Sequence, residues 1–229
     1  PKNIQITQFH NPVIPDGQVS CFRNDGSQFT VNLTQVHIEE DAAKLMHEKK
    51  ISLVDFNKAG VPLIEIVTEP CIRHIEDAST YAQYIQRIVQ NLKISEANLE
   101  KGEFKSDVSV SLRKKHTYGL NPRTEIKNLN SFKAVERALE YEIKRQRGLW
   151  EAGTPPAHQT TRGWDESSQS TTEQRTKEDS ADYRYFPEPD LPPITFTEDE
   201  IKELAFSLPE MPAEKLKRFI TDYNLQDED

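Results

Sequence analysis

The segment PLIEIVTEP, at Pro62–Pro70, sets one glutamate inside a run of apolar and β-branched residues. Such a run, bounded by prolines, is typical of a β-strand. On the two-residue period of a strand, Glu65 shares a face with Leu63 and Val67. A carboxylate inside a buried strand has to be paired or bound to a cation. Glu65 is therefore a candidate site residue, and an arginine-paired glutamate at a sheet rim is an equal alternative.

Further strands are expected before this segment. Alternating polar and apolar residues predict strands at Gln18–Phe22 and Gln28–Leu33, joined by a hairpin turn at Asn24–Ser27. Ile51–Phe56 predicts another strand. The intervening sequence HIEEDAAKLMH, at His37–His47, is interpreted as a short polar segment, and its acidic residues also suit the N-terminus of a helix.

Helical patterns begin after the strand segment. Apolar residues at helical spacing predict a helix over Glu76–Ile94, which Asp77 or Ser79 can cap. A second, longer helix is expected from a cap at Asn130–Ser131 to about Trp150. Both helices present one apolar stripe, which indicates packing against a sheet.

The strand predicted at Asp107–Leu112 has two unlike faces. One face holds Val108, Val110 and Leu112, and the other holds Asp107, Ser109 and Ser111. The polar face suits a wet cavity, so Asp107 is a second candidate site residue. The alternative is a carboxylate that caps the start of the strand. Thr124–Leu129 is expected to form a further strand.

The last part of the chain changes character. Residues 158–180 are rich in Gln, Thr and Ser and are predicted to form a flexible loop. Arg162, Trp164 and Arg184 nevertheless belong to a charged and aromatic set that is denser than a linker needs. Two short helices are expected at Glu198–Phe206 and Pro212–Tyr223.

Composition narrows the function classes. The 229 residues carry a net charge of −9, which argues against broad nonspecific nucleic-acid binding but leaves room for a local basic face. Candidates for such a face are Lys114, Lys115, Arg123, Arg145 and Arg147, which a solvated surface also explains. The sequence contains no run of 18 apolar residues, so no membrane span is expected. Cys21 and Cys71 are expected to be reduced thiols without a catalytic role.

Acidic residues from separate segments suggest a metal site. Glu65, Asp107 and the acidic residues of the HIEED run could together bind a hard cation, and Mg²⁺ prefers a few carboxylates with waters and phosphate oxygens. That pattern favours ATP-linked phosphoryl chemistry. No Walker A, Rossmann or kinase glycine motif is present in the sequence. The residues alone therefore predict a divalent-metal site in a β-rich pocket.

Several segments, in order along the chain, resemble one family. They are VHIEEDAAK (36–44), LVDFNKAGVPLIEIVTEPCIR (53–73), LEKGEFKSDVSVSLR (99–113), TEIKNLNSFKAVERALEYEIKRQ (124–146) and TTRGWDESSQSTTEQRTKEDSADYRYFPEPDLPP (160–193). The sequence resembles the B subunit of the tRNA-dependent aspartyl/glutamyl amidotransferase. We expect an α+β fold with a largely antiparallel, cradle-like sheet and helices packed on one side. Residues 1–195 are expected to form the catalytic cradle domain, and residues 196–229 the start of a helical region.

The resemblance implies an activity and its partners. The B subunit uses ATP and Mg²⁺ to phosphorylate the aminoacyl carboxylate of misacylated Glu-tRNA(Gln) or Asp-tRNA(Asn), and channelled ammonia then forms the amide. This is a carbon–nitrogen ligase with glutamine as amido-nitrogen donor, a glutamine-hydrolysing glutaminyl-tRNA synthase. The implied partners are the amidase (A) subunit and the small (C) subunit of a heterotrimer, with the aminoacyl-tRNA. The implied location is the bacterial cytoplasm or an organellar matrix, without membrane attachment.

The resemblance also implies roles for individual residues. Glu40, Glu65 and Asp107 would be metal ligands or organise metal-bound water, and Glu65 would act in catalysis. Glu125 and Lys127 would bind the nucleotide or line the channel. In the family, a Glu-x-His pair on an N-terminal strand completes the metal site. That pair is expected before Pro1, so the chain as given is expected to be inactive by itself.

Two other functions fit the same residues. The first is a non-catalytic RNA-binding scaffold that lacks the upstream ligands, and a Glu-x-His strand in the full-length protein would argue against it. The second is a stand-alone Mg²⁺-dependent kinase of a small carboxylate, against which copurification with an amidase would count.

Overall fold

The chain folds as two compact units. A computed structural model describes residues 11–177, 189, 190 and 192–223. The first unit contains the strands up to Cys71, and the second contains the two long helices and the later sheet. The tip of the first hairpin, Cys21–Phe29, belongs to the second unit. The α+β class expected from the sequence is confirmed, with open sheets that are antiparallel at all but one strand pair among those described.

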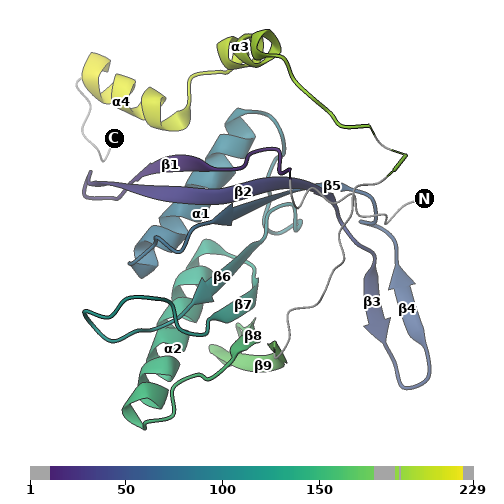
Figure 1. The fold of residues 1–229 in the computed structure, drawn as a ribbon, viewed down its shortest axis with the longest axis vertical. Helices are drawn as coiled ribbons and strands as arrows, with labels where there is room; N and C mark the ends of the chain where they lie inside the picture. Colours follow the sequence, from purple (N-terminus) through teal and green to yellow (C-terminus); the bar gives the residue numbers. More distant parts are fainter. Residues whose placement is uncertain (1–10, 178–188, 191, 224–229) are drawn as a thin grey trace. The chain divides into compact units, whose positions relative to one another are not determined.

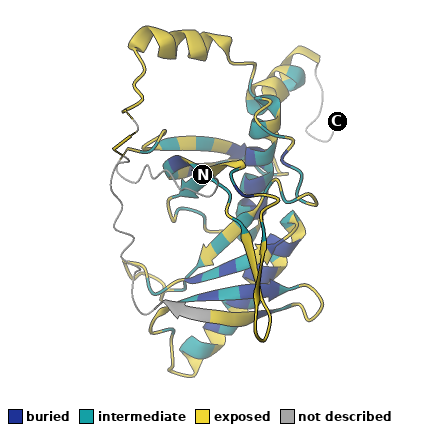
Figure 2. Ribbon diagram, turned by 90° about the vertical axis from the view of Figure 1, so that its right-hand side faces the viewer, coloured by how far each residue is buried: buried dark blue, intermediate teal, exposed yellow. Residues whose placement is uncertain are grey.

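The first unit consists of two small sheets. Strands β1 (Gly17–Phe22), β2 (Gln28–Glu40) and β5 (Pro62–Thr68) form a sheet in the order β1-β2-β5. Strands β3 (Lys44–His47) and β4 (Ser52–Asp55) pair antiparallel as a separate hairpin. Figure 2 shows this hairpin exposed along its length.

The interpretation of His37–His47 as a polar segment or a helix start is wrong. Strand β2 continues through Glu40, and β3 begins at Lys44. The strand continues because β5 offers an antiparallel partner for every position from Gln35 to Glu40. Pairing with a distant segment therefore overrides the local preference of an acidic run.

The second unit is built on a four-stranded sheet with the order β6-β7-β8-β9. Its strands are β6 (Ser106–Val110), β7 (Thr124–Leu129), β8 (Gln159–Asp165) and β9 (Ser170–Lys177). Strands β7 and β8 run parallel, because α2 (Phe132–Glu151) provides the long crossover that a parallel pair requires. Figure 1 shows α2 lying along one face of this sheet.

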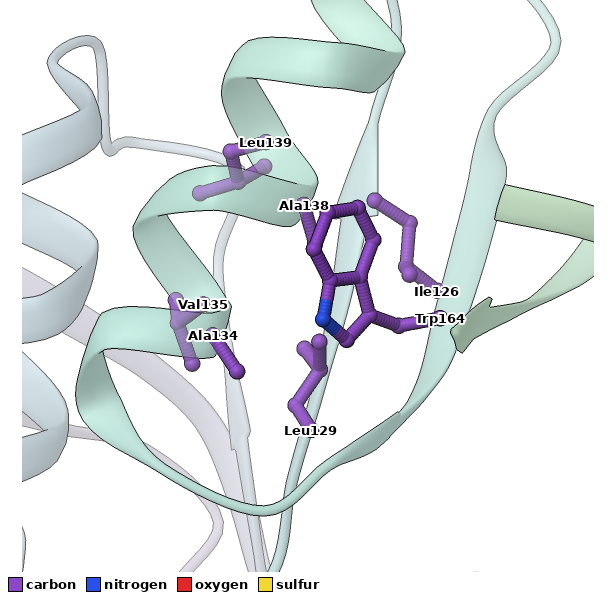
Figure 3. Close-up of a cluster of buried hydrophobic side chains, with 7 residues drawn as sticks. All are labelled: Ile126, Leu129, Ala134, Val135, Ala138, Leu139 and Trp164. Carbon is purple, nitrogen blue, oxygen red and sulfur yellow. The ribbon is translucent and has the colours of Figure 1, made fainter. Parts of the chain in front are cut away.

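The core of the second unit lies between α2 and the sheet. Trp164 from β8 and Ile126 and Leu129 from β7 pack against Ala138 and Leu139 of α2 (Figure 3). Tyr141 meets the Trp164 indole edge-on, with ring centroids 6.3 Å apart. This core lies on the face of the sheet that α2 covers. Polar side chains of β6 and β7 lie on the opposite face.

Two of the expected loop and cap assignments are wrong. Residues 158–180 include β8 and β9, whose threonine-rich sequence is polar yet well suited to strands. Helix α1 spans Ile75–Asn91, with His74 at its N-cap and no side-chain cap, so neither Asp77 nor Ser79 caps it. Asp77 is instead a buried partner of Arg23, at 2.6 Å. Arg184 lies outside the described residues.

The remaining helices match their sequence patterns closely. Helix α3 spans Glu198–Ser207, and α4 spans Pro212–Tyr223. Every residue of α3 is exposed, which Figure 2 also shows. Within the described residues, no helix combines the length and the apolar character needed to cross a membrane.

Replacing Ser131 by alanine is expected to destabilise the second unit by about 1 kcal/mol. The Ser131 side chain caps α2, because its Oγ accepts a hydrogen bond from the Ala134 backbone N–H at 3.0 Å. Chemical unfolding followed by tryptophan fluorescence measures the loss. Ser109→Ala, at an exposed strand serine, is the control and should change stability by less than about 0.5 kcal/mol. Equal effects of the two changes would contradict the capping role.

Candidate functional site

Alternation along β6 and β7 produces a polar sheet face opposite the core. Val108 and Val110 pack toward the core, whereas Asp107 and Ser109 are exposed. In β7, Thr124 and Ile126 are fully buried, and Glu125 and Lys127, which alternate with them, are half-buried. Ser109 pairs with Glu125 across the antiparallel ladder, so the polar positions of both strands fall on one face.

Lys127 joins two carboxylates on this face. Its Nζ lies 2.8 Å from Asp107 Oδ2 and 3.9 Å from Glu125 Oε1. One ammonium group therefore lies within ion-pair distance of both carboxylates.

Strand β8 adds a residue that the sequence did not single out. The Thr161 hydroxyl donates a hydrogen bond to Glu125 Oε2 at 3.2 Å, and Thr161 is 1% exposed. Thr161 pairs with Glu125 in the parallel ladder between β7 and β8. Because residues 158–180 were expected to be a loop, no strand register placed Thr161 beside the site. A strand-forming Thr-rich run is the signal that could have found it.

Glu40 and Glu65 belong to the first unit, on neighbouring strands. Glu65 lies opposite the buried His37, and Glu40 lies opposite Pro62 at the end of β2. Directly opposed residues share a sheet face, and faces alternate along a strand. Regular pleating therefore places Glu39, rather than Glu40, on the face of Glu65.

The surroundings of Glu65 differ from the expectation of a buried strand. Glu65 is exposed, and so are its neighbours Leu63 and Ile64, at 37% and 40%. The premise that burial forces this carboxylate to bind a partner is therefore wrong for this structure, because a solvated carboxylate carries no large desolvation cost. The role of Glu65 as a metal or catalytic residue stays a prediction.

The structure brings together three of the predicted site residues. Asp107, Glu125 and Lys127 form one cluster in the second unit, whereas Glu40 and Glu65 belong to the first. In the part of the chain that the structure describes, no three His, Cys, Asp or Glu side chains form a group that could hold a metal ion. The cluster has the hard oxygen donors that Mg²⁺ prefers, and this ion usually completes its coordination with waters and phosphate oxygens.

A second polar cluster lies buried on the helix side of the same sheet. Glu142 of α2 is 0% exposed and accepts hydrogen bonds from Arg145 Nη2 at 2.6 Å and Nε at 2.9 Å. Arg162 Nε of β8 lies 3.7 Å from Glu142 Oε2. Arg145, a candidate for a basic RNA-binding face, is thus committed to a buried carboxylate.

Gln146 connects this buried cluster to strands β6 and β7. Its amide, 0% exposed, donates to Val110 O at 3.2 Å and to Thr124 Oγ1 at 3.1 Å. Its Oε1 accepts from the Leu112 backbone N–H at 3.2 Å. Helix α2 is therefore tied to β6 and β7, the two strands that carry Asp107, Glu125 and Lys127.

A comparison with protein families matches most of this chain. Residues 1–202 match the model of the GatB/GatE catalytic domain. This match covers both the polar cluster on β6 and β7 and the strands that carry Glu40 and Glu65.

Curated relatives give the same result. The chain is similar to proteins named as the B subunit of aspartyl/glutamyl-tRNA(Asn/Gln) amidotransferase. One, from a Picosynechococcus species, is 44% identical, and the match covers 100% of this chain and 48% of the relative. Those from a Synechococcus species and from Carboxydothermus hydrogenoformans are 46% and 45% identical, each over 98% of this chain and 47% of their own length. The chain thus spans about half the length of these relatives.

Proposed function

This chain belongs to the GatB/GatE catalytic-domain family, and on that premise we propose that it carries out the ATP-dependent step of tRNA amidation. The substrate would be the misacylated aminoacyl group of Glu-tRNA(Gln) or Asp-tRNA(Asn), in agreement with the names of its relatives. The overall reaction would be that of a carbon–nitrogen ligase that takes its nitrogen from glutamine. The chain would provide the phosphorylation site within the longer protein.

The contact of Lys127 with both Asp107 and Glu125 is the observation that carries this proposal. Activating a carboxylate with ATP brings two anionic groups together, so the site has to offset negative charge. Lys127 is a positive charge beside two carboxylates, 2.8 Å from Asp107 and 3.9 Å from Glu125. Asp107 and Glu125 would hold Mg²⁺, and Lys127 would contact a phosphate oxygen of the nucleotide.

Each proposed site residue has a separate role in the reaction. The Mg²⁺ ion, when bound, would supply charge neutralisation at the transferred phosphoryl group. Asp107 and Glu125 would hold this ion, and Lys127 would contact the phosphates. Glu40 and Glu65 remain the proposed ligands from the first unit, with Glu65 also in catalysis. The pleat of β2 and β5 makes Glu39 a further residue to test beside Glu40.

The proposed partners follow from the names of the relatives and the chemistry. A protein named as a B subunit works with other subunits. We propose that these are the amidase (A) subunit, which releases ammonia, and the small (C) subunit of a heterotrimer. An acyl phosphate hydrolyses easily, so ammonia would have to reach it through a sheltered path. The proposed location is the bacterial cytoplasm or an organellar matrix.

Reconstitution tests this function directly. The full-length protein that contains this chain is combined with its partner subunits, Glu-tRNA(Gln), ATP, Mg²⁺ and glutamine, and the esterified amino acid is analysed after deacylation. We expect conversion of glutamate to glutamine that requires ATP. Binding of tRNA without conversion, even with added ammonia, would contradict the proposal and favour an RNA-binding scaffold. Phosphorylation of a free carboxylate without tRNA would favour a small-carboxylate kinase.

A further inference from the structure

We propose that Thr161 is a positioning residue that holds the Glu125 carboxylate in its ligand-binding orientation. This inference rests on the proposed function, because it concerns the same site. Thr161 contacts no proposed substrate group and would act through Glu125 alone. Thr161 lies in β8, a segment that the sequence pattern predicted to be a loop.

The two oxygens of Glu125 are held from two sides. The Thr161 hydroxyl donates to Oε2 at 3.2 Å, and Lys127 Nζ lies 3.9 Å from Oε1. Lys127 is much closer to Asp107, at 2.8 Å. The Thr161 hydroxyl is therefore the nearer of these two contacts to Glu125, and it keeps the carboxylate from rotating into a tighter pair with Lys127.

The backbone makes Thr161 a rigid donor. The residue is 1% exposed, and it lies in the parallel ladder directly beside Glu125. A β-branched side chain in a strand has few allowed χ1 angles, so the hydroxyl direction is restricted. A buried hydroxyl also requires a hydrogen-bond partner, and Glu125 supplies the acceptor. The carboxylate and the hydroxyl thus stabilise one another's placement.

The functional consequence concerns cation binding. Groups that orient a metal-ligating carboxylate affect metal affinity almost as strongly as the ligands themselves. Without the Thr161 hydroxyl, Glu125 can turn toward Lys127, and the Lys127–carboxylate pairs then compete better against Mg²⁺ and nucleotide. The change should weaken the binding of Mg·ATP more than it slows turnover at saturation.

A valine at position 161 tests this role with little change of shape. Titration calorimetry measures the Kd of Mg·ATP for the full-length protein in its complex. Thr161→Val should raise this Kd about tenfold, and Thr161→Ser, which retains a hydroxyl, should restore it to within about twofold. Thr160→Val is the matched control, because the Thr160 hydroxyl lies 3.2 Å from Thr124 Oγ1, on the core side of the same strand. It should leave the Kd unchanged.

The outcomes separate positioning from packing. If Thr161→Val binds Mg·ATP like the wild type, or if Thr161→Ser is as weak as Thr161→Val, the inference is wrong. Unfolding midpoints of the Thr161→Val and Thr160→Val variants show whether both lose stability to a similar extent.

A crystal structure of the Thr161→Val variant gives a readout independent of activity. We expect the Glu125 carboxylate to have turned toward Lys127, and an unchanged Glu125 would overturn the inference. If the wild type itself bound no Mg·ATP, the proposed function would fail, and the conformation of Glu125 would still decide the role of Thr161.

Discussion

Replacing Glu142 by alanine is expected to destabilise the second unit by about 3–5 kcal/mol, because it removes the buried carboxylate of a hydrogen-bonded ionic network. Glu142 is 0% exposed and is held by Arg145 at 2.6 Å and by Gln146 Nε2 at 3.0 Å. Arg162 also approaches it, at 3.7 Å, with a side chain 12% exposed. The loss includes one of the two carboxylates beside Arg162, which keeps its nearer ion pair with Glu173 at 3.3 Å.

Tryptophan fluorescence during guanidinium unfolding measures this loss. The chain has two tryptophans, Trp150 and Trp164, and both belong to the second unit, so the signal follows that unit. Glu140→Ala, at an exposed position of the same helix, is the control and should cost less than about 0.5 kcal/mol. A loss below about 1 kcal/mol for Glu142→Ala would contradict the account of the buried network.

The same carboxylate predicts a dependence of stability on pH. Burial alone would raise the pKa of Glu142, but hydrogen bonds from Arg145 and Gln146 outweigh it and hold the pKa below its ordinary value. The folded state therefore binds this proton less readily than the unfolded chain. The stabilisation is fully present above the unfolded pKa of about 4.3 and is lost as pH falls through the lower folded pKa. Glu142→Gln should flatten this acid-side loss of stability.

The strands and helices with clean periodicity could be predicted from sequence. Strand β7 and helix α4 have the predicted ends, Thr124–Leu129 and Pro212–Tyr223. Alternation along β6 correctly separated Asp107 from the buried side. In these segments the local pattern and the tertiary environment favour the same structure, which is why one sequence was sufficient.

The polar strands β8 and β9 could not be predicted because composition and pairing favour different structures. Threonine, glutamine and serine are common in loops, yet residues 159–177 contain two paired strands, of which β8 pairs with β7. The other partner of β8 is β7, which lies on the far side of the α2 crossover and therefore outside a local sequence window. The loss of Thr161 from the predicted site followed directly from this error.

The candidate site shows a similar division. Asp107 was indicated by its strand face, and Glu125 and Lys127 by resemblance, but the contact of Lys127 with both carboxylates depends on register. That register includes an irregularity between Ser106 and Val108, which no spacing rule reveals. The burial of Glu142 could not be predicted for another reason: a charged residue on a helix is normally solvated.

The central claim is that Asp107 and Glu125 with Lys127 form the Mg·ATP site for tRNA amidation. Asp107→Asn in the full-length protein keeps the shape of the side chain and removes one charge. The most direct test is the rate of ATP-dependent conversion of Glu-tRNA(Gln) by the reconstituted complex. Glu140→Gln, which also removes a carboxylate from the second unit, is the control.

We expect the Asp107→Asn rate to fall about 10²–10³-fold, because one group that holds the charge-neutralising cation is lost. The Glu140→Gln rate should stay near that of the wild type. An Asp107→Asn complex that converts Glu-tRNA(Gln) at the wild-type rate and with unchanged dependence on Mg²⁺ would contradict the assignment of this cluster as the phosphorylation site.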